Sequence, residues 1–354
     1  MRIFFIVPYP LSKAPSQRFR FEQYFDYLTS KGVQFEVSSF LDERTWDIIY
    51  KPGFVFQKLA GIMRGYFNRF KSLFYIWKCD YIFVHREIAP FGPPMLGWIF
   101  SKVMGKKIIY DFDDAIWIPN ASEHNKIMFY LKLYSNTRRL CKMAYKVSCG
   151  NNYLQRYARQ YNKNAVYNPT TIDTGNYHNK IKDQHSEKFV IGWTGSHSTI
   201  QYLDELIPVF EALEKKYSFE LHIISDREPK FKLKSLVFKA WNKDAEIADL
   251  MCFNIGLMPL SDDRWAKGKC GFKALQYMSL GIPALVSPVG VNTTIVDDGV
   301  NGFICETIED WKSRIVSVME DRELLIKLSK NTRKKIIDNY SVESNKENFL
   351  KLFS

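Results

Sequence analysis

Lysines and glycines stand directly before a short helical pattern in residues 267–290, KGKCGFKALQYMSLGIPALVSPVG. A helix N-terminus offers unpaired N–H groups and the positive end of the helix dipole, and glycine lets a backbone come close to a ligand. If residues 269–280 are helical, then Lys269, Lys273 and Gln276 lie at i, i+4 and i+7 and share one face. This spacing predicts a cationic face that binds an anion.

Three carboxylates follow an apolar strand pattern in YDFDDAIW, residues 110–117: Asp111, Asp113 and Asp114. Asp111 and Asp113 match a D-x-D pattern, which in other enzymes holds a divalent metal on a nucleotide diphosphate. We expect no metal here, because lysines and a helix end can neutralise a diphosphate without one. The carboxylates are then candidate catalytic residues that hydrogen-bond sugar hydroxyls or orient an acceptor hydroxyl. Capping of the next helix explains one of the three and not all of them.

Polar residues also follow other strand patterns. In IGWTGSHST, residues 191–199, a turn at the end of a strand is a candidate phosphate contact through Gly195, Ser196 and His197. His197 fits an ordinary loop residue equally well. The loop at 8–20 lacks G-x-G-x-x-G and so does not signal a dinucleotide site. The candidate acceptor contacts are Ser16, Arg18, Arg20, Arg86 and Glu87; a solvated arginine face and a local ion pair are the alternatives.

Strand and helix patterns alternate along the chain, which predicts parallel sheets covered by helices on both faces. The fold class is α/β, with two doubly wound Rossmann-like domains facing across a cleft that holds the ligand. The expected parts are an N-terminal domain at 1–170, a polar linker at 171–188, a C-terminal domain at 189–340 and a C-terminal helix at 341–354.

The net charge of +12 lies entirely in the first half, where residues 1–180 hold 26 Lys and Arg against 13 Asp and Glu. Residues 51–78 combine aromatic and basic side chains and hold no acidic residue. This composition suits the face of an anionic bilayer, and a core helix with basic ends is the alternative. No apolar run is long enough to span a membrane. The six cysteines form no CxxC pair, which indicates a reducing compartment and no structural zinc.

Several motifs together resemble glycosyltransferase family 4, retaining enzymes of the GT-B fold that use nucleotide-diphosphate sugars. The motifs in the second half are IGWTGSHSTIQYL, NIGLMPL, WAKGKCGFKALQYMSLGIPALVSPVGVN and DGVNGF, and those in the first half are SQRFR, VHRE and YDFDDAIW. The first-half motifs look like a branch found in bacterial polysaccharide gene sets.

The resemblance implies roles for individual residues. Gln276 stands where the family's second donor-site glutamate binds a ribose hydroxyl, whereas Gly268 stands where the first glutamate holds the donor sugar and cannot replace it. The turn at Gly195 stands where the family has a diphosphate-binding Arg, so Lys269 and Lys273 are expected to supply that charge. Asp111 aligns with a histidine near the reacting sugar in many relatives. The backbone of Cys270, Gly271 and Phe272 matches the family's phosphate-side loop.

By resemblance, the chain is expected to be a retaining, metal-independent transferase that needs no cofactor. It would move a sugar from a UDP- or GDP-sugar to a glycan on a polyprenyl diphosphate, in O-antigen, capsule or exopolysaccharide assembly. We expect it in the cytoplasm, bound peripherally to the inner face of the cytoplasmic membrane through its basic half, and without a nucleic-acid partner. A sugar-nucleotide 2-epimerase of GT-B fold and a non-catalytic module with a decayed donor site are the alternatives.

Overall fold

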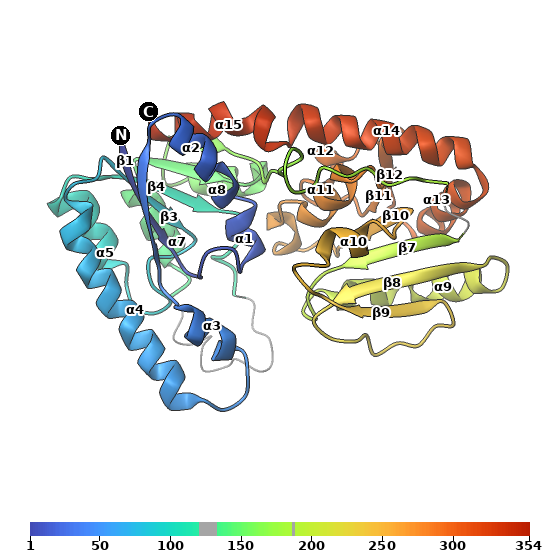
Figure 1. The fold of residues 1–354 in the computed structure, drawn as a ribbon, viewed down its shortest axis with the longest axis horizontal. Helices are drawn as coiled ribbons and strands as arrows, with labels where there is room; N and C mark the ends of the chain where they lie inside the picture. The colour runs from blue at the N-terminus through green and yellow to red at the C-terminus, as the bar shows by residue number, and fades with distance from the viewer. Residues whose placement is uncertain (120–132, 186–187) are drawn as a thin grey trace. The chain divides into compact units, whose positions relative to one another are not determined.

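The computed structural model describes residues 1–119, 133–185 and 188–354. These residues form two compact units (Figure 1). Unit 1 comprises Met1–Thr170 and Lys346–Ser354, and unit 2 comprises Thr171–Asn345. Each unit contains a six-stranded parallel sheet, so the predicted α/β class with two doubly wound units is confirmed.

The sheet of unit 1 has the strand order β2-β1-β3-β4-β5-β6. Its strands are β1 (Arg2–Val7), β2 (Gln34–Ser39), β3 (Tyr81–His85), β4 (Lys107–Phe112), β5 (Lys146–Cys149) and β6 (Ala165–Tyr167). The central strands are buried along nearly their whole length, as expected for a parallel sheet covered on both faces. The chain leaves β1 toward one edge for β2 and returns on the other side of β1 for β3. The carboxyl ends of β1 and β3 therefore flank a topological switch point, where open α/β sheets bind ligands.

The helices of unit 1 connect these strands. They are α1 (Pro15–Arg18), η1 (Glu22–Tyr24), α2 (Phe25–Ser30), α3 (Glu43–Ile49), α4 (Val55–Ile76), α5 (Met95–Trp98), a π-helical turn η2 (Ile99–Val103), α7 (Asn136–Met143) and α8 (Asn152–Arg159). Residues 15–30 form three short helical pieces and not one continuous helix. The buried Gln17 side chain bonds the backbone N–H and C=O of Tyr9, and Phe21 has non-helical backbone angles, so the helix is interrupted.

The C-terminal residues complete the core of unit 1. Helix α15 (Val342–Leu350) is followed by a turn η5 (Lys351–Phe353). The ring of Phe349 stacks on Tyr24 with 4.3 Å between centroids, and Phe353 packs beside Phe5 and Phe83. These aromatic contacts explain why the last nine residues belong to unit 1.

The sheet of unit 2 has the order β12-β11-β10-β7-β8-β9 and its switch point lies between β7 and β10. Its strands are β7 (Phe189–Thr194), β8 (Phe219–Ser225), β9 (Leu236–Ala240), β10 (Ile255–Met258), β11 (Ala284–Val286) and β12 (Gly302–Ile304). Strand β9 lies at the sheet edge and is only half-buried, and its short apolar run is flanked by lysines and polar residues.

The helices of unit 2 cover both faces of its sheet. They are η3 (Ile200–Leu206), α9 (Ile207–Glu214), α10 (Glu246–Leu250), η4 (Ala266–Gly268), α11 (Phe272–Ser279), α12 (Asn292–Ile295), α13 (Ile308–Glu320) and α14 (Arg322–Asn339). Glycines allow the closest packing: a Cβ at Gly256 in β10 would lie 2.2 Å from the ring of Tyr277 in α11. This contact fixes α11 against β10, at the switch point.

Candidate functional site

Lys273 in the first turn of α11 is a half-buried ammonium group beside the carboxyl end of β7. Its Nζ lies 4.2 Å from the centroid of the Trp193 ring and donates to Thr199 Oγ1 at 3.3 Å. No carboxylate pairs with Lys273 in the part of the chain that the structure describes. Burial, reinforced by the charge of Lys269, lowers its pKa to about 7. An ammonium group held without a counterion is a site for an anion.

The turn after β7 lies against this ammonium group. A Cβ at Gly195 would lie 2.8 Å from Lys273 Nζ and 2.6 Å from the Trp193 ring, so only glycine leaves this space open. Ser196 Oγ bonds Ser198 Oγ, and Thr199 closes the turn by donating from its N–H to the C=O of Ser196. The structure therefore brings together Gly195 and Lys273, which are 78 positions apart in the sequence.

The segment before α11 differs from the predicted helix over 269–280. Helix α11 begins at Phe272, after Gly271 in a left-handed conformation with φ of 70°, and Lys269 is extended. A Cβ at Gly271 would also lie 2.2 Å from Ile295 Cδ1. The predicted shared helical face of Lys269 and Lys273 is therefore wrong, although the two charges are close enough for Lys269 to lower the Lys273 pKa. The helix ends before Gly281, as predicted.

Gln276 lies one turn further along α11 and is buried. Its Nε2 has no hydrogen-bond partner among the described residues. A buried amide nitrogen without a partner is costly, and a ligand hydroxyl at this turn would satisfy it. Cys270 is buried and Phe272 half-buried, while buried Gly268 ends the turn η4.

His197 is about half exposed and belongs to a separate pair. Its Nδ1 lies 2.5 Å from Asp226 Oδ2, and its backbone N–H donates to Asp226 Oδ1. Burial opposes the charged form of Asp226, but these hydrogen bonds outweigh it and lower the pKa of that carboxyl. The sequence analysis did not include Asp226, which follows β8 at the same sheet edge.

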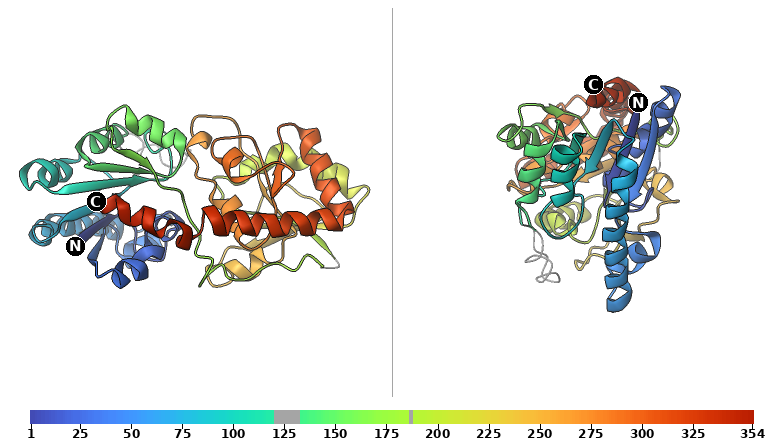
Figure 2. Two further views of the ribbon diagram at one scale, coloured as in Figure 1. Left: turned by 90° about the horizontal axis from the view of Figure 1, so that it is seen from above. Right: turned by 90° about the vertical axis from the view of Figure 1, so that its left-hand side faces the viewer.

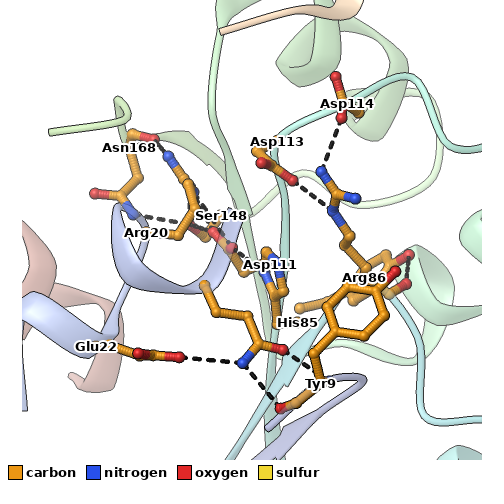
Figure 3. Close-up of polar contacts among 12 residues, drawn as sticks. Tyr9, Arg20, Glu22, His85, Arg86, Asp111, Asp113, Asp114, Ser148 and Asn168 are labelled. Atoms are coloured by element: carbon orange, nitrogen blue, oxygen red, sulfur yellow. Dashed lines mark hydrogen bonds and ion pairs between the residues drawn. The ribbon is translucent and has the colours of Figure 1, made fainter. Parts of the chain in front are cut away.

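A buried polar cluster occupies the corresponding edge of unit 1 (Figure 3). Asp111 in β4 accepts hydrogen bonds from Arg20 at 2.5 Å, Ser148 Oγ at 2.6 Å and His85 Nδ1 at 2.9 Å. Burial opposes ionisation, but the Arg20 charge and the His85 hydrogen bond outweigh it and hold the pKa of Asp111 below its usual range. Arg20 also donates to the C=O of Asn168.

This cluster corrects two sequence-based assignments. Arg20 was predicted to contact an acceptor, but it is 1% exposed and its guanidinium is held by Asp111 and Asn168. Asp111 was predicted to act directly, but it is fully buried and both of its oxygens accept hydrogen bonds from protein groups. Its hydrogen bond to Nδ1 fixes the orientation of the His85 ring.

His85 was not among the predicted site residues. It ends β3 next to the switch point, and its Nε2 is buried with no partner among the described residues. Because the ionised Asp111 can only accept, Nδ1 carries a proton, and in the neutral ring Nε2 is a free acceptor. A histidine at the end of a strand could have been selected from the sequence by the same rule that selected Arg86.

Arg86 takes a left-handed conformation with φ of 59° and holds the other two carboxylates. Its Nε donates to Asp113 at 2.7 Å and a terminal NH₂ group to Asp114 at 2.8 Å. Burial works against the charged forms, but the ion pairs outweigh it, so the pKa of Arg86 is raised and that of Asp113 lowered. The three candidate carboxylates thus divide into one buried member and an Arg86-bound pair.

The loop after β1 supplies a second missed residue, Glu22. It accepts hydrogen bonds from Gln17 Nε2 at 3.1 Å and from the Ser12 backbone N–H at 2.8 Å. Burial raises its pKa despite these hydrogen bonds. Figure 3 shows Glu22, Tyr9 and His85 around the carboxyl end of β1 and β3. A carboxyl with a raised pKa next to a histidine suits proton transfer.

The remaining predicted acceptor contacts lie around this cluster. Ser16 and Arg18 are half-buried in α1, with the Arg18 guanidinium 5.0 Å from the Phe19 ring centroid. Glu87 is half-buried and follows Arg86. Burial above all, and then the charges of Tyr50 and Glu87, raise the pKa of the Tyr9 phenol. Within the described residues, no three His, Cys, Asp or Glu side chains form a metal-binding group.

Comparison with known proteins agrees with this architecture. Residues 188–321 match the family described as Glycosyl transferases group 1. No curated protein sequence matches the chain.

Solved structures with low sequence identity share the whole fold. Sucrose-phosphate synthase from Thermosynechococcus elongatus is 12% identical over 99% of this chain and 98% of that chain, with a TM-score of 0.69. A glycosyltransferase from Rickettsia africae is 14% identical over 99% and 97%, with a TM-score of 0.68. Anabaena HepE in complex with UDP-glucose is 14% identical over 99% and 98%, with a TM-score of 0.65. The chain therefore has the predicted GT-B fold of glycosyltransferases, and most of unit 2 matches a glycosyltransferase family.

Proposed function

We propose that the protein is a glycosyltransferase that moves a sugar from a nucleotide-diphosphate donor to a hydroxyl group of a glycan. The observation that carries the proposal is the Lys273 ammonium group, half-buried without a carboxylate partner beside the Gly195 turn. The family match over residues 188–321 includes both residues and supports a sugar-nucleotide as the anion.

The chemistry needs positive charge where the donor breaks. When the bond from the sugar carbon to the diphosphate oxygen breaks, its electron pair stays on the diphosphate. Lys273, Lys269 and the positive end of the α11 dipole would stabilise that charge. These groups are fixed before the reaction, so little reorganisation is needed. We propose that no metal takes part and that the configuration of the sugar is retained, as the sequence resemblance implies.

UDP-sugars are the first donors to test. HepE, one of the structurally similar proteins, was solved with UDP-glucose. The buried Gln276 would donate a hydrogen bond from Nε2 to a ribose hydroxyl, because Nε2 has no hydrogen-bond partner among the described residues. Gly268 offers no side chain for the sugar, so the sugar is held by other groups, and GDP-sugars stay in the test.

In unit 1, His85 and Glu22 would receive the acceptor hydroxyl. Nε2 of His85 is an unpartnered acceptor in the neutral ring, and Glu22 is a carboxyl whose pKa is raised by burial. The acceptor is proposed to be a lipid-linked glycan of bacterial cell-surface polysaccharide assembly. The concentration of basic residues in the first half of the chain supports an acceptor that carries a diphosphate.

Calorimetry with UDP, GDP, CMP and dTDP, without divalent ions, tests the donor site. We expect one diphosphate to bind the wild type and Lys273→Met to bind it at least about tenfold more weakly, since a charged hydrogen bond is lost. Lys312→Met is the matched control, because Lys312 is an exposed lysine on α13 with a partner in Glu309. No binding of any diphosphate would favour a non-catalytic module, and binding only with a divalent ion would overturn the lysine mechanism.

Turnover of the sugar conjugates of the nucleotide diphosphate that binds then distinguishes a transferase from a 2-epimerase. A transferase releases nucleotide diphosphate only when a glycan acceptor is present. Conversion of the donor to an epimer without any glycan would instead identify a 2-epimerase. The variant His85→Gln is expected to lower turnover while the Kd of the nucleotide stays unchanged, because it alters only the acceptor side.

A further inference from the structure

Helix α4 has an inner face that is built for close packing. The buried residues of this 22-residue helix are Gly61, Gly65, Arg69, Ser72 and Ile76. A Cβ at Gly61 would lie 2.1 Å from Thr45 Oγ1, and one at Gly65 would lie 2.7 Å from the C=O of Phe40. This face therefore needs small residues and accounts for the contact of α4 with the rest of unit 1.

Arg69 anchors the inner face. Its guanidinium is buried and donates to the C=O groups of Val7, Ser38 and Ile88 at 2.6–2.8 Å. These acceptors lie at the carboxyl ends of β1 and β2 and after β3. The orientation of α4 is thus fixed by directed hydrogen bonds, and the face that it turns outward is fixed with it.

The outer face of α4 is a continuous apolar stripe. Its members are spaced by three or four residues and are 55–85% exposed: Phe56, Leu59, Met63, Phe67, Phe70, Phe74 and Trp77. At 3.6 residues per turn this spacing puts them on one side, opposite the buried glycines. With a rise of about 1.5 Å per residue the stripe is roughly 30 Å long. Figure 2 shows α4 along the outside of unit 1.

The charged residues of the α4 segment itself are all basic. Residues 51–78 contain Lys51, Lys58, Arg64, Arg69, Lys71 and Lys78 and no acidic residue, although Arg69 is buried on the inner face. Lys71 and Lys78 are exposed beside the stripe, and the Lys71 Nζ lies 4.9 Å from the Phe67 ring centroid. Arg64 pairs with Asp42 of the neighbouring α3 segment.

We propose that the outer face of α4 docks on an anionic lipid bilayer. The helix would lie in the interface plane, with its aromatic stripe among the acyl chains and its lysines at the anionic headgroups. None of the helices within the described residues is long and apolar enough to cross a membrane.

Charge favours a bilayer over a second copy of the chain. The three- and four-residue spacing of the stripe would also suit a helix pair. In such a pair, the lysine-bearing edges of both copies would flank the seam without any acidic partner on α4, and like charges would repel. An anionic lipid surface complements the exposed Lys71 and Lys78 beside the C-terminal half of the stripe.

This surface would place the enzyme at the membrane that carries its acceptor. That consequence rests on the proposed function, whereas the docking itself does not. Vesicle binding is measured without substrate, and nucleotide binding without vesicles. Failure of the docking and failure of the proposed activity are therefore separate results.

Flotation of the full chain with vesicles tests the proposal. We expect binding to an equal mixture of phosphatidylglycerol and phosphatidylcholine at low salt, and much weaker binding to phosphatidylcholine alone. Neutralising two lysines in Lys71→Gln/Lys78→Gln is expected to weaken binding to the anionic vesicles about 25-fold, at about fivefold for each charge.

The triple variant Phe56→Ser/Phe67→Ser/Phe74→Ser removes three exposed rings and is expected to weaken binding to the same vesicles at least about tenfold. Its matched control is Val300→Ser/Ile308→Ser/Ile337→Ser, which removes three exposed apolar side chains from unit 2. Circular dichroism melts should show both variants folded, because the changed residues are exposed. Absence of wild-type binding at low salt, or an equal loss in the control, would overturn the proposal. A dimer that dissociates in the phenylalanine variant, without vesicle binding, would assign the surface to a second copy.

Discussion

Nucleotide-diphosphate binding is expected to weaken as the pH rises above 7, and Lys273 is the cause. Burial and the nearby Lys269 charge lower its pKa to about 7 in the empty protein. Above that pH the side chain is mostly neutral, so binding a diphosphate there must be coupled to uptake of a proton. The bound anion raises the pKa of the lysine again, because it stabilises the ammonium form.

The expected size follows from this linkage. Each pH unit above about 7 should raise the Kd tenfold, equivalent to about 1.4 kcal/mol, until the pH reaches the lysine pKa of the complex. From about pH 7 to about pH 9 the loss is then up to 100-fold. The folding stability of the empty protein should change with pH in the opposite direction to its affinity for the diphosphate. Because the unfolded lysine holds its proton to higher pH, the contribution of Lys273 makes the folded state more stable as the pH rises from 7 toward 10.

Calorimetry in two buffers with different ionisation enthalpies measures both the Kd and the proton uptake. Lys273→Met should bind weakly at every pH and take up no proton. Lys273→Arg keeps a charge at all these pH values, so its Kd should not follow the pH even if the larger side chain weakens binding. A wild-type Kd that stays constant from pH 7 to about pH 9, or a methionine variant with the wild-type slope, would refute the assignment of Lys273 to the diphosphate.

Three further substitutions test the packing and the charges around the two sheet edges. Gly195→Ala should weaken diphosphate binding about tenfold or more, because its Cβ would lie 2.8 Å from Lys273 Nζ and 2.6 Å from the Trp193 ring; unchanged calorimetric affinity would show that the turn has room. Gly65→Ala should lower the free energy of unfolding in urea by about 1–3 kcal/mol although alanine is the better helix former, since its Cβ would lie 2.7 Å from the C=O of Phe40. A gain in stability would mean that α4 is not held as described. Asp111→Asn should lower the free energy of unfolding by about 3–5 kcal/mol, because it removes the carboxylate that pairs with the buried Arg20 charge. Because the pKa of Asp111 is lowered, its contribution to stability is present above about pH 4 and is lost as the pH falls through the lowered pKa; the variant should therefore lose less stability between about pH 4 and lower pH than the wild type.

The strands can be predicted from the sequence because each is a short apolar run followed by polar or glycine residues. The runs RIFFIV, YIFVH and FELHIIS, for example, are β1, β3 and β8 in the structure. Helix starts were less certain. The lysine spacing suggested a helix from residue 269, but the left-handed Gly271 sets the start of α11 at Phe272. A glycine in the middle of a periodic pattern can belong to the helix or end it, and the contact with Ile295 that decides between the two comes from elsewhere in the chain.

The division of the three carboxylates could not be read from their spacing, because it depends on strand register. In the sheet of unit 1, Asp111 lies opposite His85 on β3 and Ser148 on β5. It is therefore inside the sheet, where only neighbouring strands and the inward-pointing Arg20 reach it. Asp113 and Asp114 come after the strand ends at Phe112 and lie where Arg86 can bind them.

A carboxylate inside the sheet is useful as a support for a group at its edge. Asp111 accepts from Nδ1 of His85, which fixes the ring and leaves Nε2 without a partner among the described residues. Because the register places Asp111 beside His85, we propose His85 in place of Asp111 for the direct contact with the acceptor. If that is correct, Asp111→Asn should lower turnover because His85 is misoriented. The double variant should then be hardly slower than His85→Gln alone, because removing His85 also removes the effect of Asp111 on turnover. Losses that multiply in the double variant would show that Asp111 acts on the reaction independently of His85.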